Sequence, residues 1–318
     1  MPQVSIVIRC YNEEEHIGRL LSGIAQQALK DVEVIIVDSG STDATLSIAA
    51  RYGVKIVSIK PEEFSFGRSL NFGCSAARGD LIVIVSAHVY PLQRDWLEKL
   101  IEPFSEEKVA LTYGKQRGNG TTKYSERQVF STWFPDGPST VSQDHPFCNN
   151  ANAAIRKSVW QKLPYNENLT GLEDLDWAKR VIALGLQIVY VPPATIIHVH
   201  DETWQEIRNR YRREAIALKQ TYPTEQFRSW DFLRLLIANV ISDCYHAAHE
   251  RVFWDSFLSI CLFRFMQFWG TYQGFHEQAS IGKQLRQTFY YPKTLFRVST
   301  VTANEEKQII NYSQYDKN

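Results

Sequence analysis

Short apolar runs alternate with helical patterns over roughly the first hundred residues. After the first run a helix N-terminus is predicted at Asn12, and Ile17, Leu20, Leu21 and Ile24 follow at the spacing of one helix face. This alternation of β and α elements favours a parallel sheet with helices on both faces. The predicted strands of this part are residues 4–9, 34–37, 54–59 and 81–85.

The pattern is less regular beyond this point. Strands are predicted at residues 109–113 and 152–155, and two further short strands at 187–190 and 194–199. Residues 115–147 are rich in Gly, Ser, Thr and Pro, so we predict a long loop there. Ordered loops of this length are often lids or binding loops.

Near residue 204 the chain changes character. From there onward the pattern is helical and aromatic, without strand alternation. We therefore predict an α/β domain over residues 1–203 and a helical extension over residues 204–318.

The helical extension carries bulky apolar side chains together with Arg251 and Arg264. Because exposing several such side chains to water is costly, we expect them to contact the α/β domain, a second subunit or lipid. Aromatic helices with arginine can lie at a membrane surface, which predicts peripheral membrane contact, with a homodimer as the alternative. These side chains are Trp254, Phe257, Phe265, Phe268 and Trp269.

Composition excludes some classes of partner. The 318 residues carry 35 basic and 35 acidic side chains, so bulk charge does not favour nucleic-acid binding. The five cysteines are scattered without a CxxC pair, as expected for reduced side chains in the cytosol. The sequence shows no signal-peptide pattern at its start and no apolar run near the roughly 18 residues of a membrane span. We expect a cytoplasmic protein, with membrane contact only at the inner face.

Polar residues follow two predicted strands, at the edge where open α/β sheets bind ligands. Asp38 ends the second strand, and Ser86, Ala87 and His88 follow the fourth. A carboxylate at the first place can accept hydrogen bonds from a base or a ribose, or it can cap the following helix. Both readings of Asp38 stay open on the sequence alone.

Two segments in combination resemble the opening of the family 2 nucleotide-sugar glycosyltransferases with a GT-A fold. They are VSIVIRCYNEEEHIGRLLSGI and VEVIIVDSGSTDATLSIA, and a third segment, GLEDLDWAKRVIALG, resembles the acidic acceptor-side motif of that family. The resemblance covers roughly residues 3–215. It implies a Rossmann-like sheet and an inverting transferase that moves a sugar from a nucleotide diphosphate donor to an acceptor hydroxyl, usually with a divalent metal.

The resemblance also implies donor-binding residues. It places Asp38 at the nucleotide base, and Arg9 and Tyr11 along the nucleotide pocket, where Tyr11 can stack on a ring or simply pack. Arg68 belongs to FGRSLNFG, which resembles the segment that reaches toward the donor phosphates. An arginine can form a bidentate contact with phosphate oxygens, although an ordinary surface arginine is the alternative.

The segment Ser86-Ala87-His88 departs from the family pattern, which has an Asp-x-Asp motif holding Mg²⁺ or Mn²⁺ here. Ser86 is a poor ligand, but the family also uses a histidine at the third place of the motif and another after the last core strand. These correspond to His88 and His200, and His198 lies two residues before His200, on the same face of a predicted strand. Three hypotheses stay open: the histidines bind a divalent ion, bind the diphosphate directly, or pack in the core.

Glu173 and Asp174 open a predicted helix that follows Gly171. Inverting transfer needs one base to take the proton of the acceptor hydroxyl, and the resemblance gives this role to Asp174. The helix dipole would also stabilise acids in a first turn, but the neighbouring Glu173 adds like charge. We predict that this acidic pair is catalytic.

The predicted function is transfer of a sugar to a carbohydrate or glycolipid acceptor, in the synthesis of cell-surface polysaccharide or glycolipid. The missing carboxylates at residues 86–88 leave a rival hypothesis, a non-catalytic protein that binds sugars or membranes. A nucleotidyltransferase would need a Gly-rich phosphate loop with a basic residue near the N-terminus, and the sequence has none.

Overall fold

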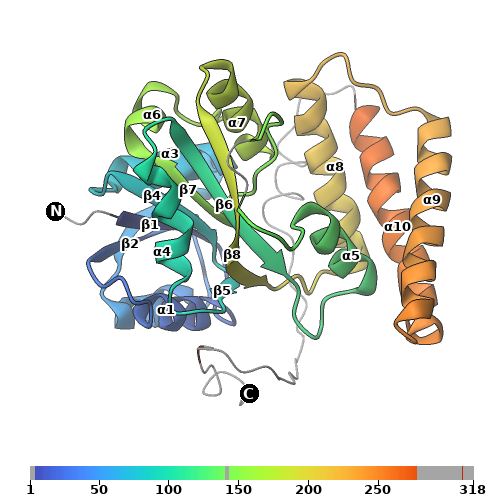
Figure 1. The fold of residues 1–318 in the computed structure, drawn as a ribbon, viewed down its shortest axis with the longest axis horizontal. Helices are drawn as coiled ribbons and strands as arrows, with labels where there is room; N and C mark the ends of the chain where they lie inside the picture. Colours follow the sequence, from blue (N-terminus) through green and yellow to red (C-terminus); the bar gives the residue numbers. More distant parts are fainter. Residues whose placement is uncertain (1–3, 140–142, 278–309, 311–318) are drawn as a thin grey trace.

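The computed structural model describes residues 4–139, 143–277 and 310. Within them, an eight-stranded sheet with helices on both faces forms the larger part, and the helices α8, α9 and α10 stand beside it (Figure 1). The strand order is β3-β2-β1-β4-β7-β6-β8-β5. The strands are β1 Val4–Cys10, β2 Val32–Asp38, β3 Lys55–Ser58, β4 Leu81–Ser86, β5 Val89–Pro91, β6 Val109–Arg117, β7 Asn152–Arg156 and β8 Gln187–His198.

The core follows from the alternation of side chains along the strands. In β4, Val83 and Val85 face one helical layer, and Ile82 and Ile84 face the other. All four are buried because helices cover both faces of the sheet, which explains the unbroken apolar run in the sequence. One layer contains α1 Ile17–Ala25, α2 Thr45–Ala49 and α4 Trp96–Ile101, and the other α3 Phe66–Ala76, α6 Lys157–Lys162 and α7 Glu173–Ala183.

The sheet is parallel in its first half and mixed in its second. The strands β3, β2, β1 and β4 run parallel, as predicted from the alternating pattern of this part of the chain. The strand β7 pairs antiparallel with β4 and β6, and β5 pairs antiparallel with β8. Because Val89 in β5 lies opposite His198 in β8, the turn that follows β4 lies beside the carboxyl end of β8. This pairing creates the candidate site.

The prediction of a long loop over residues 115–147 was wrong in part. Within it lies the helix α5 Tyr124–Trp133. The helical pattern of α5 is weak in the sequence because the charged Glu126 is buried with Phe130 on its inner side. The two short strands predicted around Pro192 and Pro193 are a single strand, β8.

The helix predicted from Asn12 begins at Ile17 instead. Asn12 has a φ of 52°, and its Oδ1 accepts a hydrogen bond from the Thr42 backbone N–H at 2.8 Å. Asparagine tolerates this left-handed conformation better than most residues, because its short side chain can form local hydrogen bonds. Asn12 therefore joins two loops at the carboxyl edge of the sheet and does not cap α1.

The C-terminal helices of the described chain are α8 Trp204–Thr221, α9 Ser229–His249 and α10 Phe253–Phe275. The first of them begins at the predicted domain boundary, with a capping box between Thr203 and Glu206. Between α9 and α10, Arg264 forms a buried two-pronged ion pair with Asp243. No helix within the described residues combines the length and the apolar character needed to cross a membrane.

Candidate functional site

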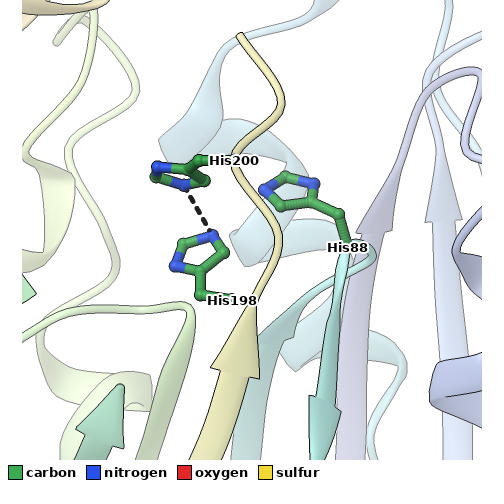
Figure 2. A group of neighbouring side chains, drawn as sticks. All are labelled: His88, His198 and His200. Carbon is green, nitrogen blue, oxygen red and sulfur yellow. Dashed lines mark hydrogen bonds between the residues drawn. The ribbon is translucent and has the colours of Figure 1, made fainter. Parts of the chain in front are cut away.

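Three histidines meet at the carboxyl edge of the sheet (Figure 2). His88 lies in the turn between β4 and β5, His198 is the last residue of β8, and His200 lies two residues further on. The rings of His88 and His198 are stacked with centroids 5.0 Å apart, and the centroids of His198 and His200 lie 4.0 Å apart. One potential ligand atom from each side chain lies within 4.8 Å of the other two.

Each of these imidazoles has an oxygen atom against its Nδ1. For His88 it is Oε1 of Glu13 at 2.8 Å, and for His198 it is Oε1 of Gln116 at 2.8 Å. For His200 it is Oε1 of the buried Glu126, at 2.7 Å. The Nε2 atoms of His198 and His200 lie 2.9 Å apart and form a hydrogen bond, which Figure 2 marks by a dashed line. The oxygens hold the three rings in place, with the Nε2 atoms of His198 and His200 turned toward each other.

The charges around the cluster differ between its members. Burial lowers the pKa of His198 well below its usual value, and His200 and His88 lower it further. Burial would also lower the pKa of His88, but the adjacent Glu13 carboxylate outweighs this effect and raises it. His198 is therefore a neutral imidazole at physiological pH, which is the form that coordinates metals.

A buried ion-pair network joins this cluster to the C-terminal helices. Arg210 in α8 donates to both carboxylate oxygens of Glu126, at 2.8 and 3.0 Å, and its Nη2 lies 2.7 Å from Glu202. Arg210 and His200 together lower the pKa of Glu126 to about 2, despite the opposing effect of its burial. Glu126 is therefore ionised, and α8 takes part in orienting His200.

The predicted catalytic acids lie in the first turn of α7 and are both buried. Glu173 forms an ion pair with Arg9 at the end of β1, at 2.9 Å. Asp174 accepts hydrogen bonds from the backbone N–H groups of Asn150 at 3.0 Å and Leu175 at 2.8 Å. Burial and the charge of Glu173 nevertheless raise the pKa of Asp174 to about 7.

Arg9 connects the acidic pair with the histidines. It is aligned with Ser86 in the pairing of β1 and β4, two residues before His88. The pKa values of Asp174 and His88 are both raised overall, and the positive charge of Arg9 opposes this increase in each case. The structure thus brings Arg9, Ser86, His88 and the acidic pair of α7 to the same edge of the sheet.

The remaining residues predicted to bind the donor have contacts within the protein itself. Asp38 is buried, and its carboxylate accepts from the backbone N–H groups of Gly40 and Ser41, so it shapes the turn after β2. Tyr11 is half-buried directly after β1. Arg68 lies in the first turn of α3 and forms an ion pair with Glu167 at 2.7 Å. The roles of Asp38, Tyr11 and Arg68 toward the donor stay predictions.

The sequence interpretation did not identify the residues that orient the histidines, and it did not include His198 among the ligands. Glu13 carries a visible signal, since it belongs to the first motif of the family resemblance. Gln116 and Glu126 lie in the segment predicted to be a loop and had no signal.

Three clustered imidazoles can hold a divalent ion, and their nitrogen donors fit ions that accept imidazole.

Comparison with known proteins agrees with this fold. Residues 5–163, half of the chain, match the family described as glycosyl transferase family 2. The chain is 27% identical over 224 residues to the O-antigen chain rhamnosyltransferase WbaN of Salmonella anatum, covering 66% of this chain and 70% of that protein.

Two solved structures are similar in fold. A mannosyltransferase from Pyrobaculum calidifontis in complex with GDP-Man and Mn²⁺ has a TM-score of 0.58 and 19% identity, covering 86% of this chain and 84% of that one. Glucosyl-3-phosphoglycerate synthase from Mycobacterium tuberculosis, with Mn²⁺, UDP and phosphoglyceric acid, has a TM-score of 0.51 and 24% identity, covering 69% and 78%. The family match and the shared architecture show that the chain belongs to glycosyl transferase family 2 and has the GT-A fold of those enzymes.

Proposed function

We propose that the chain transfers a sugar with inversion from a nucleotide diphosphate donor to an acceptor hydroxyl, with Asp174 as the base. The observation that carries this proposal is the buried Asp174 at the carboxyl edge of the sheet, with a pKa raised to about 7. A base whose pKa lies near the working pH is ionised often enough to act and still accepts a proton readily.

The proposed reaction has one displacement step. The acceptor oxygen attacks the anomeric carbon while Asp174 takes its proton, and the bond between that carbon and the phosphate oxygen breaks. The nucleoside diphosphate leaves with the electron pair. Arg9 and the histidine cluster lie at the same edge of the sheet, where positive charge or hydrogen-bond donors would stabilise the departing diphosphate. When bound at the histidines, a divalent ion would supply this charge.

The donor pocket follows the predicted assignments. Asp38 and Tyr11 would contact the nucleoside, and Arg68 would reach the phosphates by exchanging its ion pair with Glu167. The half-exposed state of Arg68 leaves room for this exchange. The hydroxyl of Ser86 would donate a hydrogen bond to the diphosphate. It stands where the family pattern has the first Asp of the Asp-x-Asp motif.

The acceptor belongs to cell-surface polysaccharide or glycolipid synthesis in this proposal. Support comes from the Salmonella relative, which is an O-antigen chain rhamnosyltransferase. The rival function, binding of a sugar without transfer, keeps the same pocket but would need no ionisable Asp174.

The first experiment is a panel of nucleotide sugars, with activated rhamnose and mannose among them, screened by thermal shift. Release of the nucleoside diphosphate with and without candidate acceptors then separates transfer from binding, and NMR of the product gives its anomeric configuration. Inversion supports the proposal. Retention of configuration would contradict the single displacement, and donor binding without turnover for every acceptor would favour the non-catalytic protein.

We also propose that the helical extension contacts a membrane surface. Helices α9 and α10 expose several large apolar side chains, which are here together called the apolar face. Trp254 is 87% exposed and Trp230 is 70% exposed, whereas tryptophan side chains in folded proteins are on average largely buried. The apolar face consists of Trp230, Leu233, Ile237, Ile241, Tyr245, Trp254, Phe257, Leu258 and Phe265.

The structure changes two details of the predicted membrane contact. Phe268 is buried, so it belongs to the packing of α10 and cannot meet lipid. Arg264 is also buried and pairs with Asp243, so the positive charge offered to anionic lipid would come from exposed arginines such as Arg234 and Arg251.

A further inference from the structure

A cleft lined by aromatic side chains lies at the C-terminal end of α5, against the strands β6 and β8. Its volume is about 390 Å³, which is within the range of sites that hold small ligands. We call it the aromatic cleft. The apolar side chains that line it are Tyr113, Trp133, Pro135, Phe147 and Tyr190.

The rings of the aromatic cleft are held by one another. The edge-to-face contacts of Phe147 have centroids 4.9 Å from Trp133 and 5.6 Å from Tyr113. Tyr113 in turn is stacked on Tyr190 at 5.0 Å, and its hydroxyl donates to Oε1 of Gln143 at 2.9 Å. The cleft is therefore a preformed surface of rings that needs little rearrangement to receive a ligand.

Trp133 is the open wall of the aromatic cleft. It is 55% exposed although it contacts Phe147, whereas its neighbours Phe130 and Phe134 are buried. Tryptophan is on average highly buried in folded proteins, and a large indole ring beside a cavity offers much contact area to a ligand. The exposure of Trp133 thus adds a free ring surface to the cleft.

The polar lining of the cleft is neutral. It consists of Thr132, Gln143 and His145, and the lining residues of the described chain include no Asp, Glu, Lys or Arg. The lack of charged groups does not favour a phosphate or an anionic lipid headgroup. A hydrocarbon chain would take water away from the polar groups without replacing their hydrogen bonds. A sugar ring matches both parts, because its C–H faces are apolar and its hydroxyl edge forms hydrogen bonds.

The aromatic cleft lies on the side of the sheet that carries the acidic pair. Tyr113 is aligned with Ala153, and Ala153 with Ile84, two residues before Ser86. All three aligned side chains belong to the core layer of α7. Since neighbouring strands lie about 4.8 Å apart, Tyr113 is on the order of 10 Å from β4. This separation is longer than one sugar ring.

One segment joins the cleft to the proposed base. Phe147 lines the cleft, and three residues further on the backbone N–H of Asn150 donates to Asp174 at 3.0 Å. The cleft wall is therefore continuous with the segment that holds Asp174. A chain of sugars with its reacting end at Asp174 could follow this segment into the cleft.

We propose that the aromatic cleft is an acceptor subsite that binds a neutral sugar unit of a saccharide chain, at a distance from the unit that receives the new sugar. The inference rests on the proposed function, in which the acceptor is a carbohydrate or glycolipid. Binding energy gained at a remote part of a substrate can lower the barrier at the reacting centre. The subsite would thus make the protein prefer acceptors of more than one sugar unit.

Occupation of the cleft can be observed on the full chain without any donor. The protein is labelled with 5-fluorotryptophan, and the fluorine resonances that disappear in Trp133→Phe and Trp254→Phe identify these two side chains. Mono-, di-, tri- and tetrasaccharides of mannose, rhamnose and galactose are then added. We expect the longer saccharides to shift the Trp133 resonance at lower concentration than the monosaccharides, and the Trp254 resonance to stay in place.

Variants connect this shift with affinity. Trp133→Ala should weaken binding of the saccharide that binds best by roughly five- to tenfold in calorimetry, because one aromatic contact is lost, and Trp133→Phe should lose less. Leu184→Ala is the matched control, since Leu184 is 59% exposed and lies outside the cleft. Thermal melts show whether each variant is folded. In transfer assays, Trp133→Ala should raise KM for long acceptors and leave monosaccharide acceptors unchanged.

Several results would overturn the subsite. One is the absence of a Trp133 shift with every saccharide, and another is equal affinity of Trp133→Ala and Leu184→Ala. A shift with monomeric dodecylphosphocholine alone would assign the cleft to a lipid chain, and a shift with protein concentration alone would assign it to a second copy. A saccharide-induced shift without turnover of any nucleotide sugar would support the subsite and count against the proposed function. Transfer by Trp133→Ala with unchanged dependence on acceptor length would overturn the subsite alone.

Discussion

Asp174 receives two backbone hydrogen bonds, which favour its charged form, yet its pKa is raised to about 7. Burial and the negative charge of Glu173 outweigh those hydrogen bonds. Glu173 itself is paired with Arg9, so the two neighbouring acids occupy different environments.

Replacing Asp174 by Asn tests its role as the base. We expect the rate of transfer to fall by roughly two to four orders of magnitude, the usual contribution of a general base, with little change in donor affinity. Asp176→Asn is the matched control, because Asp176 lies in the same first turn but pairs with Arg180 at 3.0 Å. Near-normal turnover of Asp174→Asn, or an equal loss in both variants, would remove Asp174 from the mechanism.

The raised pKa of Asp174 also predicts a pH dependence of stability. A carboxyl group with a raised pKa in the folded protein stabilises the fold below its unfolded pKa, near 3.9, and this contribution disappears as the pH rises through about 7. We therefore expect the melting temperature of the protein, compared with that of Asp174→Asn, to fall between pH 5 and pH 8. Thermal melts in matched buffers measure this difference. A difference that is constant across the range would show that Asp174 is ionised at low pH.

At the scale of elements, α8 and α10 approach each other through glycine. A Cβ atom added at Gly270 would lie 2.3 Å from the carbonyl oxygen of Arg208, and one at Gly274 would lie 2.4 Å from that of Arg212. Real Cβ atoms do not come this close to backbone, so the two helices would have to separate. The network around Arg210, which orients His200, lies on the same helix α8.

Substitution of Gly270 by Ala should therefore destabilise the protein. Alanine in a helix is ordinarily better than glycine by about 0.5–1 kcal/mol, but overpacking at a tight contact costs about 1–3 kcal/mol. We expect a lower free energy of unfolding, measured by denaturant titration. Gly120→Ala serves as the control, since a Cβ there meets nothing within 4 Å. A stabilised Gly270→Ala protein would mean that α8 and α10 do not pack as closely as described.

For the whole molecule, the apolar face and the histidine cluster are linked by α8. Arg210 in α8 binds Glu126 beside the cluster, while α10 packs on α8 through Gly270 and Gly274. Removing the extension would also remove Arg210, so a truncated chain would not test membrane contact alone. Membrane binding must be tested on the full chain with substitutions in the apolar face.

We expect the full chain to float with liposomes that contain anionic lipid, and to float less at high salt. Trp254→Ser together with Leu258→Ser should weaken binding at least tenfold, because each large apolar side chain moved out of water contributes roughly 1.5–3 kcal/mol. Trp133→Ser is the matched control, as Trp133 is also exposed but lies on α5, outside the apolar face. Failure to float, together with a stable dimer in sedimentation, would assign the apolar face to a subunit interface.

The sequence by itself determined the features that depend on short-range patterns. The strand runs, the alternation of the parallel half, and the placement of Asp38, His88 and Asp174 at element ends all follow from neighbouring residues. These features could be predicted because periodicity and strand ends are local properties. The family resemblance added the expected fold and general activity, which the family match supports, whereas the roles of single residues stay predictions.

Only the tertiary structure decided how the site is assembled. The pairing of β5 with β8 brings His88 to His198, and neither strand is near the other in sequence. The segment predicted to be a loop contains the helix α5, whose buried Glu126 pairs with Arg210 and contacts His200. A buried charge needs a partner of opposite charge, and here that partner comes from a distant part of the chain. The hydrophobic periodicity of the local sequence therefore could not predict it.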